Sequence, residues 1–438
     1  MVNYTKELSH CAIAILIFIP CTVSLTLTAT LGPLSPLLQL LTVVIVQLVF
    51  FISEIGNLQA ITWTMLILGT EICHLGLFAN EGLLSFFVFY EAALIPLIIL
   101  ISRFGSGNQR LRSTIVFCIF TIAGAMPMLC ATLYLIQFTE NLVIAGGVNM
   151  FISFHTFHSE TIILWIAYAI SFMVKTPLYP FISWLLAAHT EAPVEGSVLL
   201  AGIVLKLATF GISVILIANL WEGSNHLMAV AEALGLITLF VSSLAMVQQY
   251  DLKGFVALSS VAHMSLGVLG LMCLSQSGLY GGWILGFAHG IISPCLFILF
   301  GGYIYRSFST RLIYPLRGVN VAVPLASIAI FTSLLANIGF PPFANWVSEI
   351  LIIVSLVDKL IFTGSVATIL LIFAVIYTLW CYGVTVSGIW SPNLRATTDA
   401  SSRILLGVGL LVGMSLLIGI KLGGWELSLE EGSYRLVS

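Results

Sequence analysis

Charged side chains are scarce in this chain. Among 438 residues there are 15 Lys and Arg and 18 Asp and Glu, or 8% charged, while 60% are apolar. Soluble domains are typically about 25% charged and about 45–50% apolar. Too little polar material is present to cover a soluble core, so the composition excludes a soluble enzyme and a secreted disulfide domain. The formal net charge of −3 also provides no basic surface for nucleic acid.

Recognisable cofactor motifs are missing as well. The eight cysteines form no CxxC pair, and most lie in apolar runs, where cysteine behaves as a small hydrophobic residue. Neither GxxxxGK[ST] nor GxGxxG occurs, which argues against a nucleotide or flavin site. The HxxH of His155 and His158 lacks a third ligand. The sequence therefore predicts no cofactor and no metal on this chain.

Long apolar runs dominate what is present. A transmembrane helix needs about 20 mostly apolar residues, whereas a barrel strand shows shorter alternating segments. Thirteen runs of spanning length occur, with only short connections between them, at 11–30, 36–53, 60–79, 83–102, 113–138, 161–183, 194–220, 227–247, 254–274, 280–303, 321–355, 364–389 and 404–420. We predict an all-α polytopic protein of about 13 helices, forming one membrane domain over residues 1–438.

Loop charges alternate in sign along the chain. Loops after even-numbered runs carry most of the basic residues, such as Arg103 and Arg311, whereas loops after odd-numbered runs carry acidic residues such as Glu160. An excess of Lys and Arg marks the inner side of a membrane. The pattern therefore favours thirteen spans with the N-terminus inside, meaning the cytoplasm or the mitochondrial matrix.

Prolines interrupt two of the runs. Pro177 and Pro180 lie in the sixth run, and Pro341 and Pro342 lie in the eleventh. Proline removes a backbone donor and breaks a helix. Because the two runs are five apart, they cross the membrane in opposite directions, as inverted repeats do. We predict two broken helices in two half-channel repeats, at about 82–250 and 251–390.

We single out four charged residues that lie inside apolar runs: Glu91, Lys175, Lys206 and Glu349. A charge at the centre of a spanning helix costs about 3 kcal/mol on insertion scales, and such residues commonly mark ion or proton paths. We favour a proton or ion path. The alternative is a set of interhelical ion pairs that only stabilise the bundle.

Three histidines accompany these charges. His263 and His289 lie inside runs, and His189 lies in the connection AAHTEAPVEG. Imidazole titrates near neutral pH, so these side chains are candidate proton-relay residues. The alternative is that they are hydrogen-bonded packing residues.

Several segments together resemble a known family. They read FFVFYEAALIPLIILISRFG, FMVKTPLYPFISWLLAAHTEAPVEGSVLLAGIVLKLATFG, SSVAHMSLG, AHGIISPCLF and NIGFPPFANWVSE. They resemble the antiporter-like membrane subunits of respiratory NADH:ubiquinone oxidoreductase (complex I), from about Phe86 to Ile352. Family members usually have fourteen helices, with four before the run that contains Glu91, whereas three runs precede it here.

This resemblance implies roles for the buried residues. Glu91 and Lys175 correspond to the charged pair of the first half-channel, and Lys206 to the central lysine. His263 and His289 correspond to members of the hydrated central axis. Glu349 corresponds to the terminal residue of the second half, and a glutamate there favours subunit 4 over subunit 5.

The resemblance further implies a proton-translocating subunit, with NADH oxidation and ubiquinone reduction in other subunits. Its implied partners are the other membrane-arm subunits, including neighbouring antiporter-like ones, and the lipid bilayer. The implied location is the mitochondrial inner membrane or, alternatively, a bacterial plasma membrane. Two other functions stay open: a subunit of a multi-subunit sodium/proton antiporter, and a structural scaffold subunit.

Overall fold

The fold is a bundle of membrane-length helices. The computed structural model describes residues 34–53, 60–80, 82–137, 158–389, 391 and 398–437, without the side chains of 158–159 and 422–437. Its helices are α2 (Leu34–Ile52), α3 (Ala60–Phe78), α4 (Leu83–Ala92), α5 (Leu94–Phe104), α6 (Arg110–Ile136), α8 (His158–Lys175), α9 (Ser183–Glu191), α10 (Val194–Leu199), α11 (Leu205–Gly211), α12 (Trp221–Val247), α13 (Leu252–Met272), α14 (Gln276–Leu296), α15 (Tyr305–Phe308), α16 (Val319–Ala322), α17 (Pro324–Asn337), α18 (Ala344–Lys359), α19 (Ile361–Thr385) and α20 (Ser402–Val437). Three π-helical segments join some of them, namely η2 (Leu200–Val204), η3 (Ile212–Asn219) and η4 (Phe297–Ile304).

The helices account for the apolar runs. Ten helical stretches in the described part of the chain are long and apolar enough to cross a membrane. The sixth and eleventh runs are not among them, because they are broken into α8 and α9 and into α17 and α18. The first run, 11–30, and His155 lie outside the described residues. The all-α multi-spanning fold is thus confirmed, while the count of thirteen stays a prediction.

Both predicted breaks are present, and at each one a side chain hydrogen-bonds to a carbonyl that the break leaves unpaired. Proline leaves the preceding helix with an unpaired carbonyl, which must find another donor at membrane depth. At the first break the Trp184 indole donates to the Val174 carbonyl over 2.8 Å. At the second the Asn345 amide donates to the Asn337 carbonyl over 3.3 Å. In each case a side chain of the following helix donates a hydrogen bond to the carbonyl that the break leaves unpaired in the preceding helix.

A third interruption separates α4 from α5 at Ala93. Pro96 has no N–H to donate to the carbonyl four residues earlier, which belongs to Ala92. Glu91 therefore lies one residue before the end of α4, inside the apolar stretch Leu83–Phe104 that is long enough to cross a membrane.

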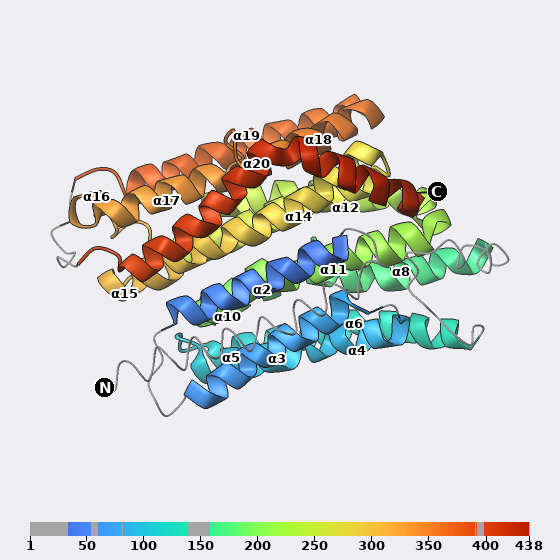
Figure 1. The fold of residues 1–438 in the computed structure, drawn as a ribbon, viewed down its shortest axis with the longest axis horizontal. Coiled ribbons are helices and arrows are strands. Elements are labelled where there is room, and N and C mark those ends of the chain that lie inside the picture. Colours follow the sequence, from blue (N-terminus) through green and yellow to red (C-terminus); the bar gives the residue numbers. More distant parts are fainter. Residues whose placement is uncertain are drawn as a thin grey trace.

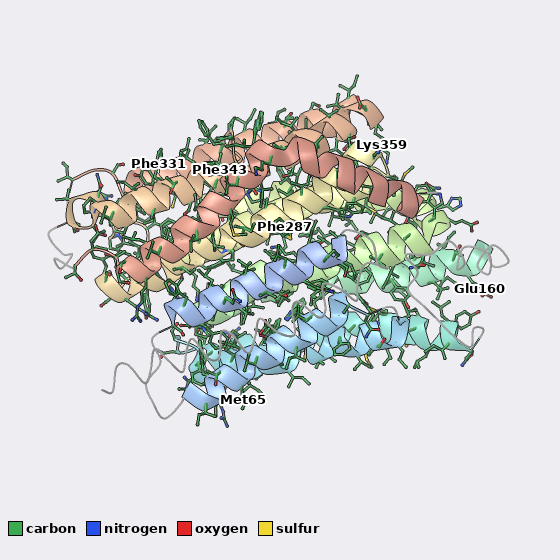
Figure 2. All side chains as sticks on the ribbon, in the orientation of Figure 1. Met65, Glu160, Phe287, Phe331, Phe343 and Lys359 are labelled. Atoms are coloured by element: carbon green, nitrogen blue, oxygen red, sulfur yellow. The ribbon has the colours of Figure 1, made fainter. Side chains whose placement is uncertain are left out.

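Burial divides the bundle into a centre and a periphery. The apolar stretches of α13, of α14 and of the segment from α10 to η3 are wholly buried, whereas only 39% of the residues in those of α3 and α6, and 22% in that of α19, are buried. Figure 1 shows α14 in the middle of the bundle, and Figure 2 shows Phe287 there and Met65 near the outer edge. The outer helices expose large apolar side chains, such as Met65 at 66%. Such a surface suits lipid or neighbouring membrane subunits.

The two ends of the bundle differ. Glu160 and Lys359 lie at one end, while α15 and α16 lie at the other (Figures 1 and 2). At the α15 end, the Gln109 N–H donates to Glu191 over 3.2 Å. There Arg311 also pairs with Asp251 at 2.6 Å and donates to the Thr190 carbonyl. The basic loops that the sequence assigns to one side therefore meet at one end, and the compartment that they face stays a prediction.

Candidate functional site

A buried hydrogen bond joins Lys206 to His289 at the centre of the bundle. The Lys206 Nζ lies 2.9 Å from His289 Nδ1 and donates to the Ala201 carbonyl over 2.6 Å. Lys206 is 1% exposed and His289 is fully buried. Ala201 belongs to the π-helical η2, and π segments shift the backbone hydrogen-bond ladder, often at functional sites. The local backbone thus supplies an acceptor for the ammonium, which pairs with no carboxylate among the described residues.

The chain of ionisable groups continues from His289 through His263 to Glu349. The two imidazole rings have centroids 5.5 Å apart, and His263 Nδ1 lies 3.5 Å from Glu349 Oε1. His263 comes from α13, His289 from α14 and Glu349 from α18, just beyond the second break. Lys206 comes from α11, so four helices bring these four predicted residues into one buried cluster.

A small cavity adjoins the Glu349 end of this cluster. Its volume is about 30 Å³, and His263, Asn337, Glu349, Ser259 and Thr378 are among its lining residues. A water molecule needs about 10–15 Å³ of such space and two or more polar partners. The cavity therefore has room for about two waters beside the Glu349 carboxyl group.

Gly339 is matched to this site in two ways. Its φ of +76° favours glycine. A Cβ at this position would also come within 2.5 Å of a Glu349 carboxylate oxygen. Any other residue here would displace the Glu349 side chain, so the turn after α17 helps to position it.

Glu91 and Lys175 face each other without direct contact. No ion pair within 4 Å joins them in the described residues, and Glu91 Oε1 is buried without a hydrogen-bond partner. The Lys175 ammonium, 1% exposed, donates to the Tyr90 carbonyl over 3.3 Å and lies 4.1 Å above the Tyr90 ring centroid. Each charge is still within the electrostatic reach of the other. The predicted pair is thus a pair of neighbouring charges rather than a salt bridge.

Aromatic side chains separate Lys175 from Lys206. Phe86 lies against both Phe172 and Phe210, with ring centroids 6.5 Å and 6.4 Å apart. Phe172 also lies so close to Gly211 that a Cβ there would collide with its ring. We call Phe86, Tyr90, Phe172 and Phe210 the aromatic layer. Phe172 lies on α8 with Lys175 and Phe210 lies on α11 with Lys206, so the aromatic layer joins the two helices that carry these lysines.

His189 occupies a third position. Its ring stacks on Phe297 with centroids 4.5 Å apart and planes 7° apart, and neither ring nitrogen has a hydrogen-bond partner in the part of the chain described. It is fully buried and within electrostatic reach of both Lys206 and Lys253. His189 therefore lies between the central lysine and the loop end that carries Arg311.

The sequence analysis missed other buried charges. Lys253 is 2% exposed and donates to the Ala192 carbonyl, and Glu232 is 6% exposed and pairs with Lys359. Glu71 and His74 are also buried, on α3. Glu71 and Glu232 lie inside apolar runs as plainly as Glu91 does, so the same criterion applies to them. Lys253 gives no such signal, because it follows Gln249, Tyr250 and Asp251 and looks like a loop residue.

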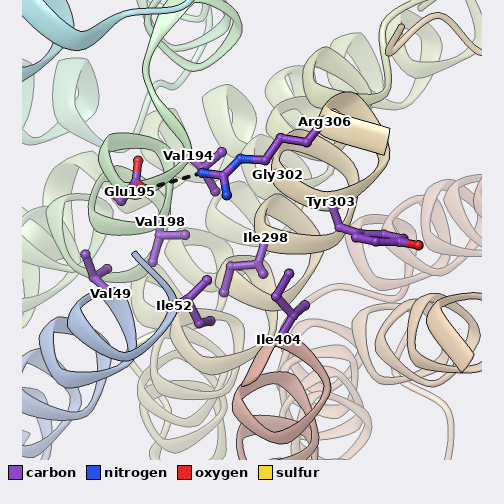
Figure 3. A pocket seen from close by; sticks show the side chains of 10 residues that line it. All are labelled: Val49, Ile52, Val194, Glu195, Val198, Ile298, Gly302, Tyr303, Arg306 and Ile404. Atoms are coloured by element: carbon purple, nitrogen blue, oxygen red, sulfur yellow. Dashed lines mark ion pairs between the residues drawn. The ribbon is translucent and has the colours of Figure 1, made fainter. Parts of the chain in front are cut away.

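A separate cleft lies between α2, α10, η4 and α20 (Figure 3). Its walls are mainly aliphatic, including Val49, Ile52 and Ile404. One ion pair borders it, between Glu195 and Arg306 at 3.9 Å. None of the seven predicted residues lines it, so the ionisable chemistry of the bundle lies elsewhere.

Sequence comparison places the chain in a family. The model of the family described as "NADH:quinone oxidoreductase/Mrp antiporter, TM" matches residues 80–373. The chain belongs to this family. It is also similar to NADH-ubiquinone oxidoreductase chain 4 of Mycosarcoma maydis, at 35% identity over 81% of this chain and 73% of that one. Chain 4 of Arabidopsis thaliana is 34% identical over 78% of this chain and 69% of that one. These matches confirm the predicted resemblance.

Solved structures share the fold of this family member. A chain of respiratory complex I from Thermus thermophilus superposes with a TM-score of 0.80 at 24% identity, covering 92% of this chain and 85% of that one. A chain of the Mrp complex from a Dietzia species gives 0.82 at 17% identity, covering 99% and 92%. Both likenesses concern the fold alone, and they agree with an all-helical membrane subunit.

Glu349 offers a test of the site. We expect Glu349→Gln to assemble normally but to lose most proton pumping, whereas Glu349→Asp keeps part of it. The carboxylate faces His263 and, within the described residues, no lysine, so glutamine leaves no buried ammonium unpaired. The measurement is complex content on native gels beside NADH-driven acidification of vesicles. A Gln variant that fails to assemble would instead indicate a structural clamp, and one that pumps normally would remove Glu349 from the path.

Proposed function

We propose that this chain is a proton-translocating membrane-arm subunit of respiratory complex I, in the mitochondrial inner membrane. Other subunits oxidise NADH and reduce ubiquinone, and this chain carries no redox centre. One observation carries the proposal: Lys206, His289, His263 and Glu349 form a buried row of neighbouring groups that can each bind and release a proton.

The row has the chemistry that proton transfer needs. His289 Nδ1 is in direct hydrogen-bond contact with the Lys206 amine, so one proton can be shared between them. The next step reaches His263 across neighbouring rings, and the last reaches Glu349 at 3.5 Å. Buried charge is unfavourable unless a partner compensates it. A proton entering the row therefore tends to move on rather than to rest at one group.

Glu91 and Lys175 control this row in the proposed mechanism. The Glu91 carboxylate stabilises the Lys175 ammonium through the field between them, without a salt bridge. When Lys175 loses or gains its proton, the potential at Lys206 beyond the aromatic layer changes, and Lys206 loads or releases its own proton. His189 is assigned to proton entry from the end that carries Arg311. The two repeats, 82–250 and 251–390, are the half-channels.

The arrangement does not suit a scaffold whose charges only lock helices together. Such a scaffold would pair its buried carboxylates with its buried ammonium groups. Over the described ranges, Glu195–Arg306, Asp251–Arg311 and Glu232–Lys359 are such pairs, whereas Glu91, Lys175 and Lys206 belong to no carboxylate–cation pair there. Because Glu91, Lys175 and Lys206 have no oppositely charged partner in direct contact in the described part of the bundle, we favour a proton path over a structural scaffold.

Purification of the native assembly tests this function. The complex is isolated from its membranes in mild detergent and reconstituted into vesicles. We expect NADH-binding and iron–sulfur subunits to co-purify, and vesicles given NADH and quinone to acidify until an uncoupler is added. A particle that lacks those subunits and moves protons in exchange for sodium would indicate the antiporter instead.

A further inference from the structure

Two ionisable side chains on α3 take no part in the row described above. Glu71 is 4% exposed and His74 is fully buried. They lie three residues apart, so they are neighbours on one face of the helix. The same face carries the other buried residues of α3, including Ile67, Thr70 and Leu77. A carboxyl and an imidazole thus replace two apolar residues in a stripe that is otherwise built for packing.

Each of these groups has a free polar atom. Glu71 Oε1 and His74 Nε2 are buried and have no hydrogen-bond partner among the described residues. His74 Nδ1 contacts the Thr70 carbonyl, which can only accept, so Nδ1 carries the hydrogen. The lone pair of Nε2 is therefore free to bind a proton. Most buried side-chain polar atoms are paired, and an exception calls for an explanation.

Glu71 and His74 lie close to the elements that surround Lys175. Phe78, one turn beyond His74, packs its ring edge-on against Phe210 of the aromatic layer, with centroids 5.3 Å apart. His74 is within electrostatic reach of Lys175. The face of α3 that holds Glu71, His74 and Phe78 thus packs toward Phe210 of the aromatic layer, with His74 in the field of Lys175.

We propose that Glu71 and His74 form a second proton-binding pair, whose charge acts on Lys175. In one state the carboxyl group holds the proton and the imidazole is neutral. In the other the proton has left the Glu71 O–H and bound His74 Nε2, giving a carboxylate and an imidazolium. The imidazolium repels the Lys175 ammonium and favours release of its proton. The inference rests on the proposed proton-translocating function and adds a positioning element to it.

The test compares Glu71→Gln and His74→Asn with the wild type in the assembled complex. We expect protons pumped per NADH to fall by about fivefold, the lower range of typical coupling between sites. Electron transfer to quinone should fall less. Glu71→Asp should keep much of the wild-type number of protons pumped per NADH, since it keeps the carboxyl group. Ile72→Val is the control, because Ile72 is the adjacent residue, 65% exposed, and should be without effect.

A parallel Glu91→Gln variant distinguishes the proposal for Glu71 and His74 from the proposed proton path. If Glu91→Gln loses pumping while Glu71→Gln and His74→Asn keep the wild-type ratio, the α3 pair is wrong and the proposed function stands. If Glu71→Asp assembles but is as defective as Glu71→Gln, the carboxyl chemistry is not what matters, and the proposal is again overturned. If Glu91→Gln also pumps normally, control of the row by Glu91 and Lys175 is wrong, and the α3 pair is overturned with it because it acts through Lys175.

Discussion

Replacing Lys206 with methionine is expected to reduce NADH-driven proton pumping to below about one tenth, while the complex still assembles. A positioned proton-transfer group contributes about 10²–10⁴-fold to such a step. Methionine approximates the length of the lysine stem but cannot bind a proton or donate to His289 and to the Ala201 carbonyl. The row is then cut at its first hydrogen bond. The measurement is the rate of vesicle acidification, normalised to the complex content of each preparation.

Lys206→Arg distinguishes a proton carrier from a fixed charge. Arginine keeps the positive charge but stays protonated in proteins. If Lys206 carries protons, the Arg variant should assemble and fail to pump, as the Met variant does. Wild-type pumping by Lys206→Arg would show that only a permanent charge is required there, and the proposed relay from Lys206 to His289 would have to be abandoned.

Glu91→Gln is expected to assemble and to lose most of its pumping, again to below about one tenth. Glutamine has nearly the same shape, but it removes the negative field that stabilises Lys175. Because Lys175 contacts the Tyr90 carbonyl and ring rather than the carboxylate, this field acts over a distance and no direct bond is lost. A defect in Glu91→Gln would therefore report on charge rather than on packing.

Glu160→Gln is the matched control for Glu91. Its carboxylate accepts from the Tyr134 hydroxyl at the end of the bundle away from α15, a contact that glutamine can keep. This variant should pump at the wild-type rate. Equal activity of Glu91→Gln and Glu160→Gln would mean that the charge at Glu91 has no role in translocation. NADH:quinone activity and membrane potential should be recorded for both variants.

Much of the fold could be predicted from the sequence because a bilayer imposes a simple rule. A helix must present about 20 apolar residues, and a proline without an N–H must interrupt it. Hydropathy therefore located the helices, and Pro177, Pro180, Pro341 and Pro342 located the two breaks. The π-helical segments around Lys206 were not predicted, since nothing in LLAGIVLKLATFGISVILIAN marks a shifted hydrogen-bond ladder.

The site was predicted only in part, for a different reason. Hydropathy identifies a charge inside a run, and it found Glu91, Lys175, Lys206 and Glu349. It does not say which groups meet, and the contact of Glu349 with His263 depends on how α13 packs against α18. Lys253 shows the limit most clearly. Its sequence neighbours are polar, yet its stem is buried and its ammonium reaches the Ala192 carbonyl in the connection between α9 and α10.

The contacts from Lys206 to Glu349 have a thermodynamic consequence. Whatever a proton on Glu349 does to the proton affinity of Lys206, a proton on Lys206 must do equally to Glu349, because linkage between binding sites is reciprocal. A buried row of this kind conducts equally well in both directions at equilibrium. Rectification has to be imposed from outside it, by changes that open one end to water while the other is closed, and in step with quinone reduction.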